Sequence, residues 1–407
     1  MLSATMVTAV AWFVSLAPPS RSAADTLRVA RLDSVPLLDG RVDEREYGTP
    51  ALELVTAAGR ARVWIGQHED FVYIAADLPD SFQRDQAMTP DLHVIFGTGP
   101  VGCWTARALR GQGKQVRAVN RNGARPDLMP ADVEIVKADA SDPVQARKAA
   151  KGAGVVYQAL NPPYHLWGEF FPGLQTSVLG AAVAEDARYV SIENLYMYDS
   201  SKPITEDSPI APVSKKGTLR QKMAEEVMAL HARGELHAVA LRSSDYYGPG
   251  VVGSALGEMV FGNLVAGKKA QMIGSTRLLH SFSYIEDVGH AAAVLGTNDT
   301  PSGRVWIAPH APAKTQGEMA EEACRVLGTE TRVRVVSPFM MRLAGLFVAN
   351  ARASVEMMYE FTAPFVVDST RMEHEFNLSA TPVRSGIERT VSWYMDRVSN
   401  EAPARST

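Results

Sequence analysis

From residue 91 onward, short apolar runs of strand length alternate along the chain with longer segments of helical pattern. The apolar runs lie at 92–96, 115–119, 133–136, 155–160, 189–192 and 237–242. Apolar strands joined by helices are typical of a parallel sheet that is covered on both faces. The pattern therefore predicts an α/β domain over 91–400 with a Rossmann-like, doubly wound parallel sheet. Helical patterns dominate from residue 315, which predicts a mostly helical C-terminal lobe, mainly in 245–400.

The segment before this domain follows a two-residue alternation. Residues 25–82 contain short alternating runs, and those at 61–67 and 71–78 predict a β-hairpin. One buried face is expected to hold four apolar residues: Val63, Ile65, Val72 and Ile74. So few strands cannot close a sandwich, so we interpret the segment as a partial, β-sandwich-like fragment.

The two ends of this fragment have patterns of their own. An apolar run at 6–17 is too short to span a bilayer and precedes a small-residue stretch, so residues 1–24 are a candidate signal peptide. No Lys or Arg precedes the run, which leaves an inert apolar tail as the alternative. Residues 83–90 form a polar linker, and Met88 within it could be the true start of the protein.

Composition narrows the class of protein. The 407 residues include 41 Lys and Arg against 45 Asp and Glu, a net charge of −4, and 46% are hydrophobic. These values are typical of a globular chain and exclude a disordered, collagen-like or polytopic membrane protein. The slight acidic excess argues against nucleic acid as a partner. Two cysteines make no disulfide framework, and the nine His show no metal-ligand spacing, so we predict no metal.

A glycine-rich loop follows the first apolar run. Its residues are Gly97, Thr98, Gly99, Pro100, Val101 and Gly102. Between a strand and a helix, this GxGxxG pattern predicts dinucleotide binding. Gly97 allows the tight turn, Gly99 the approach of a pyrophosphate, and Gly102 the close packing of the helix. Pro100 suits the first helical position, where the helix would offer free amides to phosphates.

The end of the second apolar run bears on the choice of cofactor. An NAD site usually has Asp or Glu about 20 residues after the loop. Here the position reads Asn120-Arg121, and Arg121 could pair with a 2′-phosphate. NADP(H) is therefore favoured, NAD(H) remains open, and a solvated surface charge is the alternative for Arg121. Asp139, after the third run, could reach the adenine or simply form a turn.

These motifs together resemble the extended and atypical short-chain dehydrogenase/reductases of the NAD-dependent epimerase/dehydratase family. The similarity covers about 91–390 and includes GTGPVG, VNRNG, ADASDP, ALNPPY, IENLYMYD, LRSSDYYGPGV and FSYIEDVGHA. The resemblance implies NAD(P) binding, with Ala159 and Asn161 in the cofactor site, a C-terminal substrate lobe, and commonly a homodimer. Within the fragment, LLDGRVDEREY and VWIGQHEDFVYIAADLPDS resemble the start of carbohydrate-binding family 9-like modules. Sugar binding and a non-functional remnant are both open for it.

The catalytic pattern of this family is broken here. The resemblance implies a Tyr-x-x-x-Lys pair, in which the hydroxyl exchanges a proton and the lysine lowers its pKa. Aligned on Glu226, the pair reads Thr218 and Lys222, so the tyrosine is missing. A Ser or Thr expected after the fifth strand is replaced by Asn194, preceded by Glu193.

Other residues could then carry the chemistry. Tyr198 lies just beyond the fifth run and is the best candidate acid/base, with Asn194 as an orienting donor. Lys222, or the neighbouring Lys215 and Lys216, could instead act as a base, and a solvated charge is the alternative for each. Three residues after the sixth run are expected to face substrate, unless turn packing explains them: Ser244, Tyr246 and Tyr247. The apolar segment 339–349 is too short to span a membrane, and we expect it in the core or at a dimer face.

Three functions follow from this sequence. The first is an NAD(P)-dependent oxidoreductase or epimerase/dehydratase that acts on a small carbonyl, alcohol or sugar-nucleotide substrate. The second is a non-catalytic NADP-binding sensor or regulator that has lost the tyrosine. The third is an exported sugar-binding protein with an inert second domain. We favour the cytoplasm, where NADP(H) is available, unless the signal-like segment directs export. We expect no nucleic acid and no membrane span.

Overall fold

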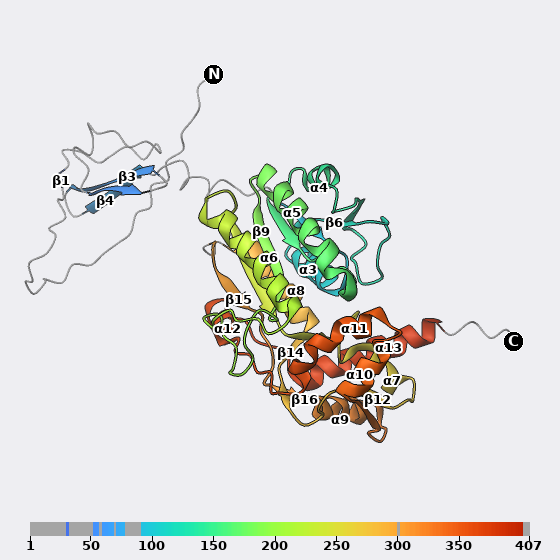
Figure 1. Ribbon diagram of the computed structural model, residues 1–407. Helices are drawn as coiled ribbons and strands as arrows, with labels where there is room; N and C mark the ends of the chain where they lie inside the picture. Colours follow the sequence, from blue (N-terminus) through green and yellow to red (C-terminus); the bar gives the residue numbers. More distant parts are fainter. Residues whose placement is uncertain are drawn as a thin grey trace, which may run out of the picture. The chain divides into compact units, whose positions relative to one another are not determined.

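The computed structural model describes two compact units, residues 1–89 and 90–407 (Figure 1). In the first unit it describes four strands, and in the second it describes residues 91–298 and 302–401. The candidate signal peptide and the linker at 83–90 lie outside the described residues.

The described strands of the first unit form one small sheet. They are β1 (Ala30–Arg31), β2 (Leu52–Thr56), β3 (Gly59–His68) and β4 (Phe71–Asp77). β3 pairs with β1, β2 and β4, and its antiparallel register with β4 sets Ile65 opposite Ile74. The predicted hairpin is therefore confirmed. The side chains of Val63, Ile65, Val72 and Ile74, expected on one buried face, lie outside what the structure describes.

A seven-stranded parallel sheet forms the centre of the second unit. Its strands are β5 (Leu92–Phe96), β6 (Gln115–Asn120), β7 (Glu134–Lys137), β8 (Val155–Gln158), β9 (Arg188–Asn194), β10 (Ala238–Ser243) and β15 (Val305–Ile307). The spatial order is β15-β10-β9-β8-β5-β6-β7. The predicted Rossmann-like sheet is confirmed, and all six predicted strands are present. Chain order reverses between β5 and β8, which is where doubly wound sheets bind ligands.

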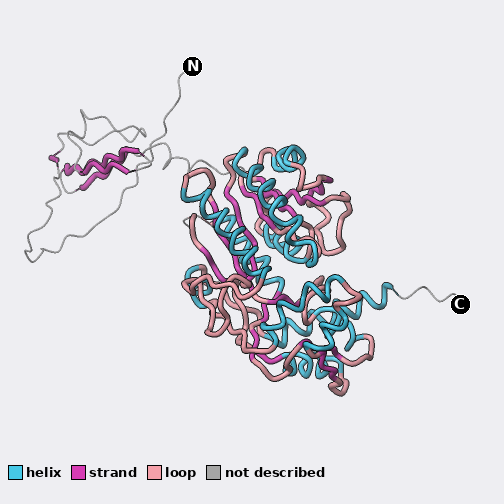
Figure 2. The backbone as a smooth tube through the Cα atoms, in the orientation of Figure 1, coloured by secondary structure: helices cyan, strands magenta, loops and turns pink. Residues whose placement is uncertain are grey.

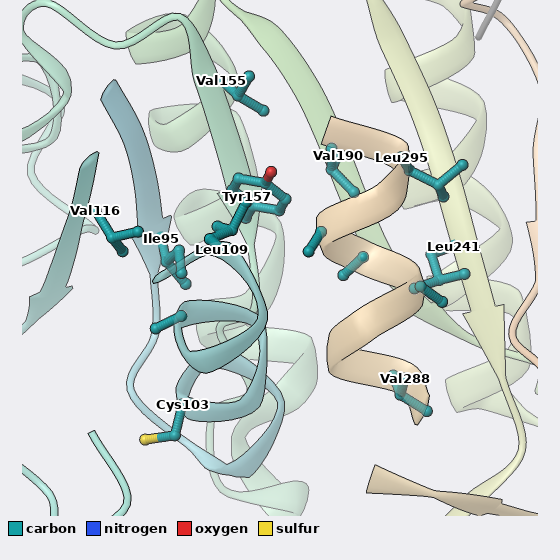
Figure 3. Packing of buried hydrophobic residues seen from close by; sticks show 14 of the residues in the cluster. Ile95, Cys103, Leu109, Val116, Val155, Tyr157, Val190, Leu241, Val288 and Leu295 are labelled. Atoms are coloured by element: carbon teal, nitrogen blue, oxygen red, sulfur yellow. The ribbon is translucent and has the colours of Figure 1, made fainter. Parts of the chain in front are cut away.

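Helices cover both faces of this sheet. One face carries α3 (Pro100–Gly111) and α8 (Ile285–Thr297), and the other carries α4 (Pro143–Ala150), α5 (Trp167–Ala184) and α6 (Lys215–Ala232). Neighbours on β5 point to opposite faces: Ile95 packs with α3 and α8 (Figure 3), whereas Phe96 packs toward α4 and α5. A Cβ on Gly289 would lie 2.5 Å from the Trp104 backbone, so glycine permits the close contact of α8 with α3.

A buried histidine in this sheet gives the fold a pH dependence. The Nδ1 atom of His93 on β5 lies 2.9 Å from the Tyr157 hydroxyl on β8. Burial, with a smaller effect from Lys114, lowers the pKa of His93 to about 4. Because the unfolded chain binds this proton at higher pH, stability should fall as pH drops from about 6.5 to about 4.

Because of His93, we expect the free energy of unfolding to fall by about 2 kcal/mol when the pH is lowered from about 7 to about 5. Urea unfolding at the two pH values measures the loss. In His93→Gln the side chain cannot be protonated but can still hydrogen-bond to Tyr157. The loss of stability of this variant between the two pH values should therefore be smaller than that of the unchanged protein by about 2 kcal/mol. An equal loss in both proteins would contradict the prediction.

The C-terminal lobe contains several short helices (Figure 2) and three two-stranded ladders. Its helical segments are η2 (Gly257–Gly262), α7 (Asn263–Val265), α9 (Gln316–Leu327), α10 (Pro338–Ala344), α11 (Ala349–Ser354), η3 (Val355–Phe361), α12 (Thr370–Glu375) and α13 (Val383–Glu401). A short helical turn that precedes the lobe in sequence, η1 (Tyr164–Leu166), contacts α11. Its ladders are β11 (Asp245–Tyr247) with β14 (Phe282–Tyr284), β12 (Ala270–Ile273) with β17 (Val333–Val336), and β13 (Leu279–His280) with β16 (Lys314–Thr315).

Two expectations for this lobe change with the structure. Tyr247, expected to face substrate, is buried in the lobe core, where it packs against Tyr284 and Phe261. The apolar segment 339–349, expected in the core or at a dimer face, exposes most of its large side chains, which excludes the core and leaves the dimer face as a prediction. Among the described residues, no helix combines the length and the apolar character that a bilayer crossing requires.

Candidate active site

The glycine-rich loop lies at the switch point of the sheet. The Gly97 N–H donates to the Val119 carbonyl at 3.0 Å, and the Ala159 N–H donates to the Phe96 carbonyl at 2.8 Å. Gly97 has φ +108°, and a Cβ there would lie 2.5 Å from the Ala159 carbonyl oxygen. Ala159 therefore lies beside the loop, at the carboxyl end of β8. Only glycine fits at position 97, as the tight turn requires.

The two other glycines of the loop differ from each other. A Cβ on Gly102 would lie 2.0 Å from the Gly97 carbonyl oxygen, so Gly102 is needed for packing. A Cβ on Gly99 would meet nothing within 4 Å, and its φ of −70° suits any residue. Neither packing nor backbone conformation thus explains glycine at position 99. The open space lies at the start of α3, which has Pro100 in its first turn and no acidic residue there.

This open space has the properties of an anion-binding cradle. The first amides of α3, including those of Val101 and Gly102, have no partner within the helix, and the positive end of the helix dipole points toward the space. The Thr98 hydroxyl accepts a hydrogen bond from the Asn120 side chain at 3.0 Å, which ties the loop to β6. The residues present therefore fit the pyrophosphate of a dinucleotide.

The end of β6 shapes the next part of the cradle. The Asn120 amide also donates to the Ala124 carbonyl at 2.8 Å, and its oxygen accepts from the Gly123 N–H at 2.6 Å. Asn120 therefore holds the turn. Arg121 is exposed. Two hydrogen bonds from Ser141 lower the pKa of Asp139, and the charge of Arg121 makes a smaller contribution in the same direction. Asp139 accepts both Ser141 bonds, as its turn-forming interpretation predicts.

Tyr198 is committed to a buried polar network. Its side chain is 1% exposed, and its hydroxyl accepts a hydrogen bond from Arg242. Arg242 also pairs with Glu193 at 2.8 Å, and the Ser191 hydroxyl donates to Glu193 at 2.8 Å. Burial raises the pKa of Tyr198, which opposes loss of its proton. This network argues for a structural role, so another group is needed as acid/base.

Thr218 and Lys222 lie outside the buried network of Tyr198, Arg242 and Glu193. Both are exposed on α6, and the Thr218 hydroxyl donates to the Ser214 carbonyl at 3.1 Å within the helix. The buried face of α6 instead carries Lys216 and Arg220, which are also four residues apart. Alignment on Glu226 therefore selected two residues on the exposed face of the helix. The helical spacing of the buried residues, rather than one acidic landmark, would have identified the inner face.

The remaining predicted residues hold the surrounding loops. Ser244 is buried, and its hydroxyl donates to the Ser281 carbonyl at 2.5 Å. Asn194 accepts from the Tyr196 N–H at 3.4 Å, and Asn161 accepts from the Trp167 indole at 3.1 Å. The Tyr246 hydroxyl lies 2.8 Å from the Ser243 hydroxyl.

The segment after β10 passes over the start of α3. The Trp104 indole of α3 donates to the Pro249 carbonyl at 3.0 Å. A Cβ on Gly250 would lie 3.7 Å from the Pro100 Cβ. The half-buried Tyr246 is a few residues away on the same segment. The chain after the sixth strand is thereby placed next to the dinucleotide cradle.

A cluster of buried polar side chains that sequence reasoning missed lies beside this segment. His280 Nε2 lies 2.9 Å from Asp245 Oδ2, and His280 Nδ1 lies 3.2 Å from the Glu360 carbonyl. His280 stacks on Phe282 and Phe361, with ring centroids 4.5 and 5.1 Å apart. These residues come from β11, from the adjoining strands β13 and β14, and from η3, which are three segments far apart in sequence, so no local motif could reveal the cluster.

The polar atoms of this cluster are incompletely satisfied. Asp245 Oδ2, His280 Nε2 and Glu360 Oε1 are buried without a hydrogen-bond partner among the described residues, since the approach of His280 to Asp245 lacks hydrogen-bond geometry. Burial, with a contribution from the charge of Asp245, raises the pKa of Glu360 well above its ordinary value. Burial likewise raises the pKa values of the adjoining Tyr164 and Tyr196. Burial therefore favours the protonated form of Glu360, and a ligand with polar groups would satisfy the cluster.

Lys216 connects this cluster to α6. Its ammonium donates to Glu356 at 2.6 Å and to the Ala353 carbonyl at 2.8 Å, and it lies 4.7 Å from the centre of the Tyr164 ring. Gly217 follows, where a Cβ would lie 2.2 Å from the Tyr196 carbonyl oxygen. The start of α6 is therefore packed tightly against the loop after β9. Among the described residues, no group of three or more His, Cys, Asp or Glu could hold a metal ion.

Comparisons with known proteins agree with this geometry. The model of the NAD dependent epimerase/dehydratase family matches residues 94–308. A UDP-glucuronic acid 4-epimerase from Bacillus cereus, solved in complex with NAD, has a TM-score of 0.61 and 14% identity over 75% of this chain and 99% of that chain. A dTDP-glucose 4,6-dehydratase from Bacillus anthracis, also with NAD, has a TM-score of 0.61 and 15% identity over 75% and 96%.

A third structure is the DesIV double mutant, a dTDP-glucose 4,6-dehydratase from Streptomyces venezuelae with NAD and DAU bound. It has a TM-score of 0.63 and 18% identity over 77% of this chain and 99% of that chain. At such identities these structures show a shared fold. No curated protein matches the chain in sequence.

Proposed function

The chain belongs to the NAD dependent epimerase/dehydratase family, and from this premise we propose that it is a nicotinamide-dependent oxidoreductase or epimerase/dehydratase. Its substrate is a small carbonyl, alcohol or sugar nucleotide. NADP(H) is the preferred cofactor. The similar structures that hold NAD, a sugar-nucleotide epimerase and two sugar-nucleotide dehydratases, support this class of reaction.

The observation that carries the proposal is the open space at Gly99. Gly97 and Gly102 are explained by packing, because a Cβ at either position would collide with backbone. Gly99 has no such explanation, yet it stands at the start of α3 beside unpaired amides. A bound pyrophosphate supplies the missing reason, since it would lie where a side chain would otherwise project.

The preference for NADP(H) rests on the end of β6. Asn120 uses its side chain to hold the turn, and no carboxylate stands there to bind the ribose hydroxyls. Arg121 is exposed and free to turn toward a 2′-phosphate, with Asp139 close enough to feel its charge. A guanidinium can hold a phosphate through two parallel hydrogen bonds.

Arg121→Ala should therefore weaken NADPH binding by about tenfold or more, while NADH binding changes little. Isothermal titration of the purified protein with each nucleotide measures the two affinities. Arg125→Ala removes a nearby cation that is already bonded to the Pro130 and Val133 carbonyls, and it serves as the control. Equal losses for both nucleotides in Arg121→Ala would remove the argument for NADP(H).

The substrate's reacting group is proposed to bind at the buried polar cluster. When bound, the nicotinamide would donate or accept hydride, and the chain must then supply or remove a proton. Glu360 is the group proposed for this, because its Oε1 has no hydrogen-bond partner among the described residues and burial raises its pKa. Asp245 Oδ2 has no hydrogen-bond partner among the described residues, although His280 Nε2 lies 2.9 Å away, and it would accept a hydrogen bond from a substrate hydroxyl.

A second candidate function is an NADP-binding sensor without turnover. The observation that favours it lies on α6, whose inner positions four residues apart are Lys216 and Arg220 rather than Tyr and Lys. Lys216 is committed to Glu356 and to the Ala353 carbonyl, so it is poorly placed to exchange a proton. A chain with this arrangement could retain the cradle and lose the reaction.

One experiment separates the two functions. Titration with NADPH and NADH is followed by nicotinamide absorbance against aldehydes, ketones and sugar nucleotides. Binding with oxidation of NADPH supports the enzyme, and in Glu360→Gln binding should persist while turnover is lost. Binding without turnover on any compound favours the sensor. Failure of both nucleotides to bind would refute the cradle and with it both functions.

A further inference from the structure

The surface of α10 and α11 carries large apolar side chains that nothing within the described residues covers. The exposed fractions are 74% for Phe339, 52% for Leu343, 69% for Leu346, 86% for Phe347 and 52% for Val348. The two helices pack closely, because a Cβ on Gly345 would lie 2.9 Å from the Arg352 Cα. Figure 1 shows them together on the C-terminal lobe. We call these five side chains the α10–α11 patch.

The segment that carries this patch has charge of one sign, and Glu330 and Glu356 lie immediately before and after it. Residues 331–355 contain four arginines and no Asp or Glu, although acidic residues outnumber basic ones by 45 to 41 in the whole chain. Arg334, Arg342 and Arg352 are exposed, and within the described residues no ion pair holds any of them. The fourth, Arg332, lies 3.9 Å from Glu330, also at the surface. A local basic excess thus surrounds the exposed apolar side chains.

From this arrangement we propose that the α10–α11 patch binds an anionic lipid surface. Exposed Phe and Leu side chains can enter the boundary between headgroups and acyl chains, while arginines on the same element pair with lipid phosphates. The segment is too short to cross a bilayer, so the protein would lie on the surface. This inference is independent of the proposed function, because the patch contains no residue assigned to the cofactor or the substrate.

A second copy of the chain fits this patch less well. In a two-fold symmetric dimer the same surface meets itself, so the arginines of one copy would approach those of the other. Removing like charges from water without partners opposes such a contact. An anionic membrane supplies the opposite charge instead. The charge pattern therefore distinguishes the two occupants and favours the lipid.

Vesicle flotation with the full chain tests the proposal. The probes are vesicles of phosphatidylcholine alone and of phosphatidylcholine with phosphatidylglycerol. We expect the protein to float with the anionic vesicles only, and to be released as salt screens the arginines. Replacing both Leu346→Ser and Phe347→Ser should weaken binding by about a hundredfold. Replacing both Arg342→Gln and Arg352→Gln should weaken it by about tenfold.

Matched changes elsewhere serve as controls. Val144→Ser removes an apolar side chain that is 76% exposed on α4, and Lys148→Gln removes an exposed cation on the same helix. Both should bind vesicles as the unchanged protein does. The N-terminal apolar run is present in every variant, so a loss caused only by the patch substitutions cannot come from it.

Three results would overturn the proposal. They are no binding to anionic vesicles at low salt, equal binding to both vesicle types, and equal binding by the patch variants. Size-exclusion chromatography with light scattering tests the alternative occupant, a second copy of the chain. A dimer that Leu346→Ser with Phe347→Ser converts to a monomer would assign the patch to contact between copies and refute the lipid assignment.

Discussion

Gly99→Val is expected to reduce NADPH binding by at least about a hundredfold and to leave the free energy of unfolding nearly unchanged. The Cβ of residue 99 projects into space that no described atom occupies within 4 Å, and φ at this residue is −70°. The folded protein therefore accepts a side chain there. The same side chain would block a pyrophosphate, because the pyrophosphate oxygens must approach the backbone at van der Waals distance. Isothermal titration measures the binding, and urea unfolding measures the stability.

Gly102→Val provides the contrast. Its Cβ would lie 2.0 Å from the Gly97 carbonyl oxygen, so this substitution should lower both stability and binding. Gly111→Ala, at the end of α3 with nothing within 4 Å of its Cβ, should alter neither by much. Retained NADPH affinity in Gly99→Val would show that no dinucleotide uses this cradle. Unfolding of Gly99→Val would show that the space at residue 99 serves packing after all.

Glu193→Ala is expected to destabilise the fold by about 3–5 kcal/mol. Glu193 and Arg242 form an ion pair at 2.8 Å, and their side chains are 1% and 3% exposed. Removal of the carboxylate leaves the guanidinium buried and without its charge partner, while Tyr198 supplies only a hydroxyl. Urea unfolding with a two-state analysis measures the effect. Asp207→Ala breaks the exposed pair with Arg371 and should barely change stability.

Tyr198→Phe separates a structural role from a catalytic one. It removes the hydroxyl that accepts from Arg242 and should lower stability by about 1 kcal/mol. If the network only supports the fold, NADPH binding and any turnover per folded molecule should remain. A selective loss of turnover would restore Tyr198 as the acid/base. Small effects in both Glu193→Ala and Tyr198→Phe would show that the network contributes little.

Patterns local in sequence predicted most of the sheet and the cofactor loop. Each of the first six strands contains a short, mostly apolar run, and the loop carries its glycines at fixed spacing, so both are visible without tertiary information. The seventh strand, Val305–Ile307, was not predicted because it has only three residues. It joins the sheet by pairing with β10, a contact that no local pattern encodes.

The candidate catalytic residues were much harder to predict. Tyr198 stands at the correct end of the sheet, but its partner Arg242 is 44 residues away, and only the fold shows that the two meet. Thr218 and Lys222 have the expected spacing, yet helical rotation turns both toward solvent. Asp245, His280 and Glu360 come together through the folding of the C-terminal lobe, with no motif to join them. Spacing along the chain thus identified the elements and not the faces that they bury.

The assembly of the polar cluster from distant segments affects when the domain can fold during protein synthesis. The cradle needs β5, α3, β6 and β8, all of which leave the ribosome early. The parallel sheet is complete only when Val305–Ile307 pairs with β10, and Glu360 emerges later still. Because a domain generally folds as a unit, the proposed nucleotide cradle and the polar cluster should form together, after most of residues 90–407 have left the ribosome.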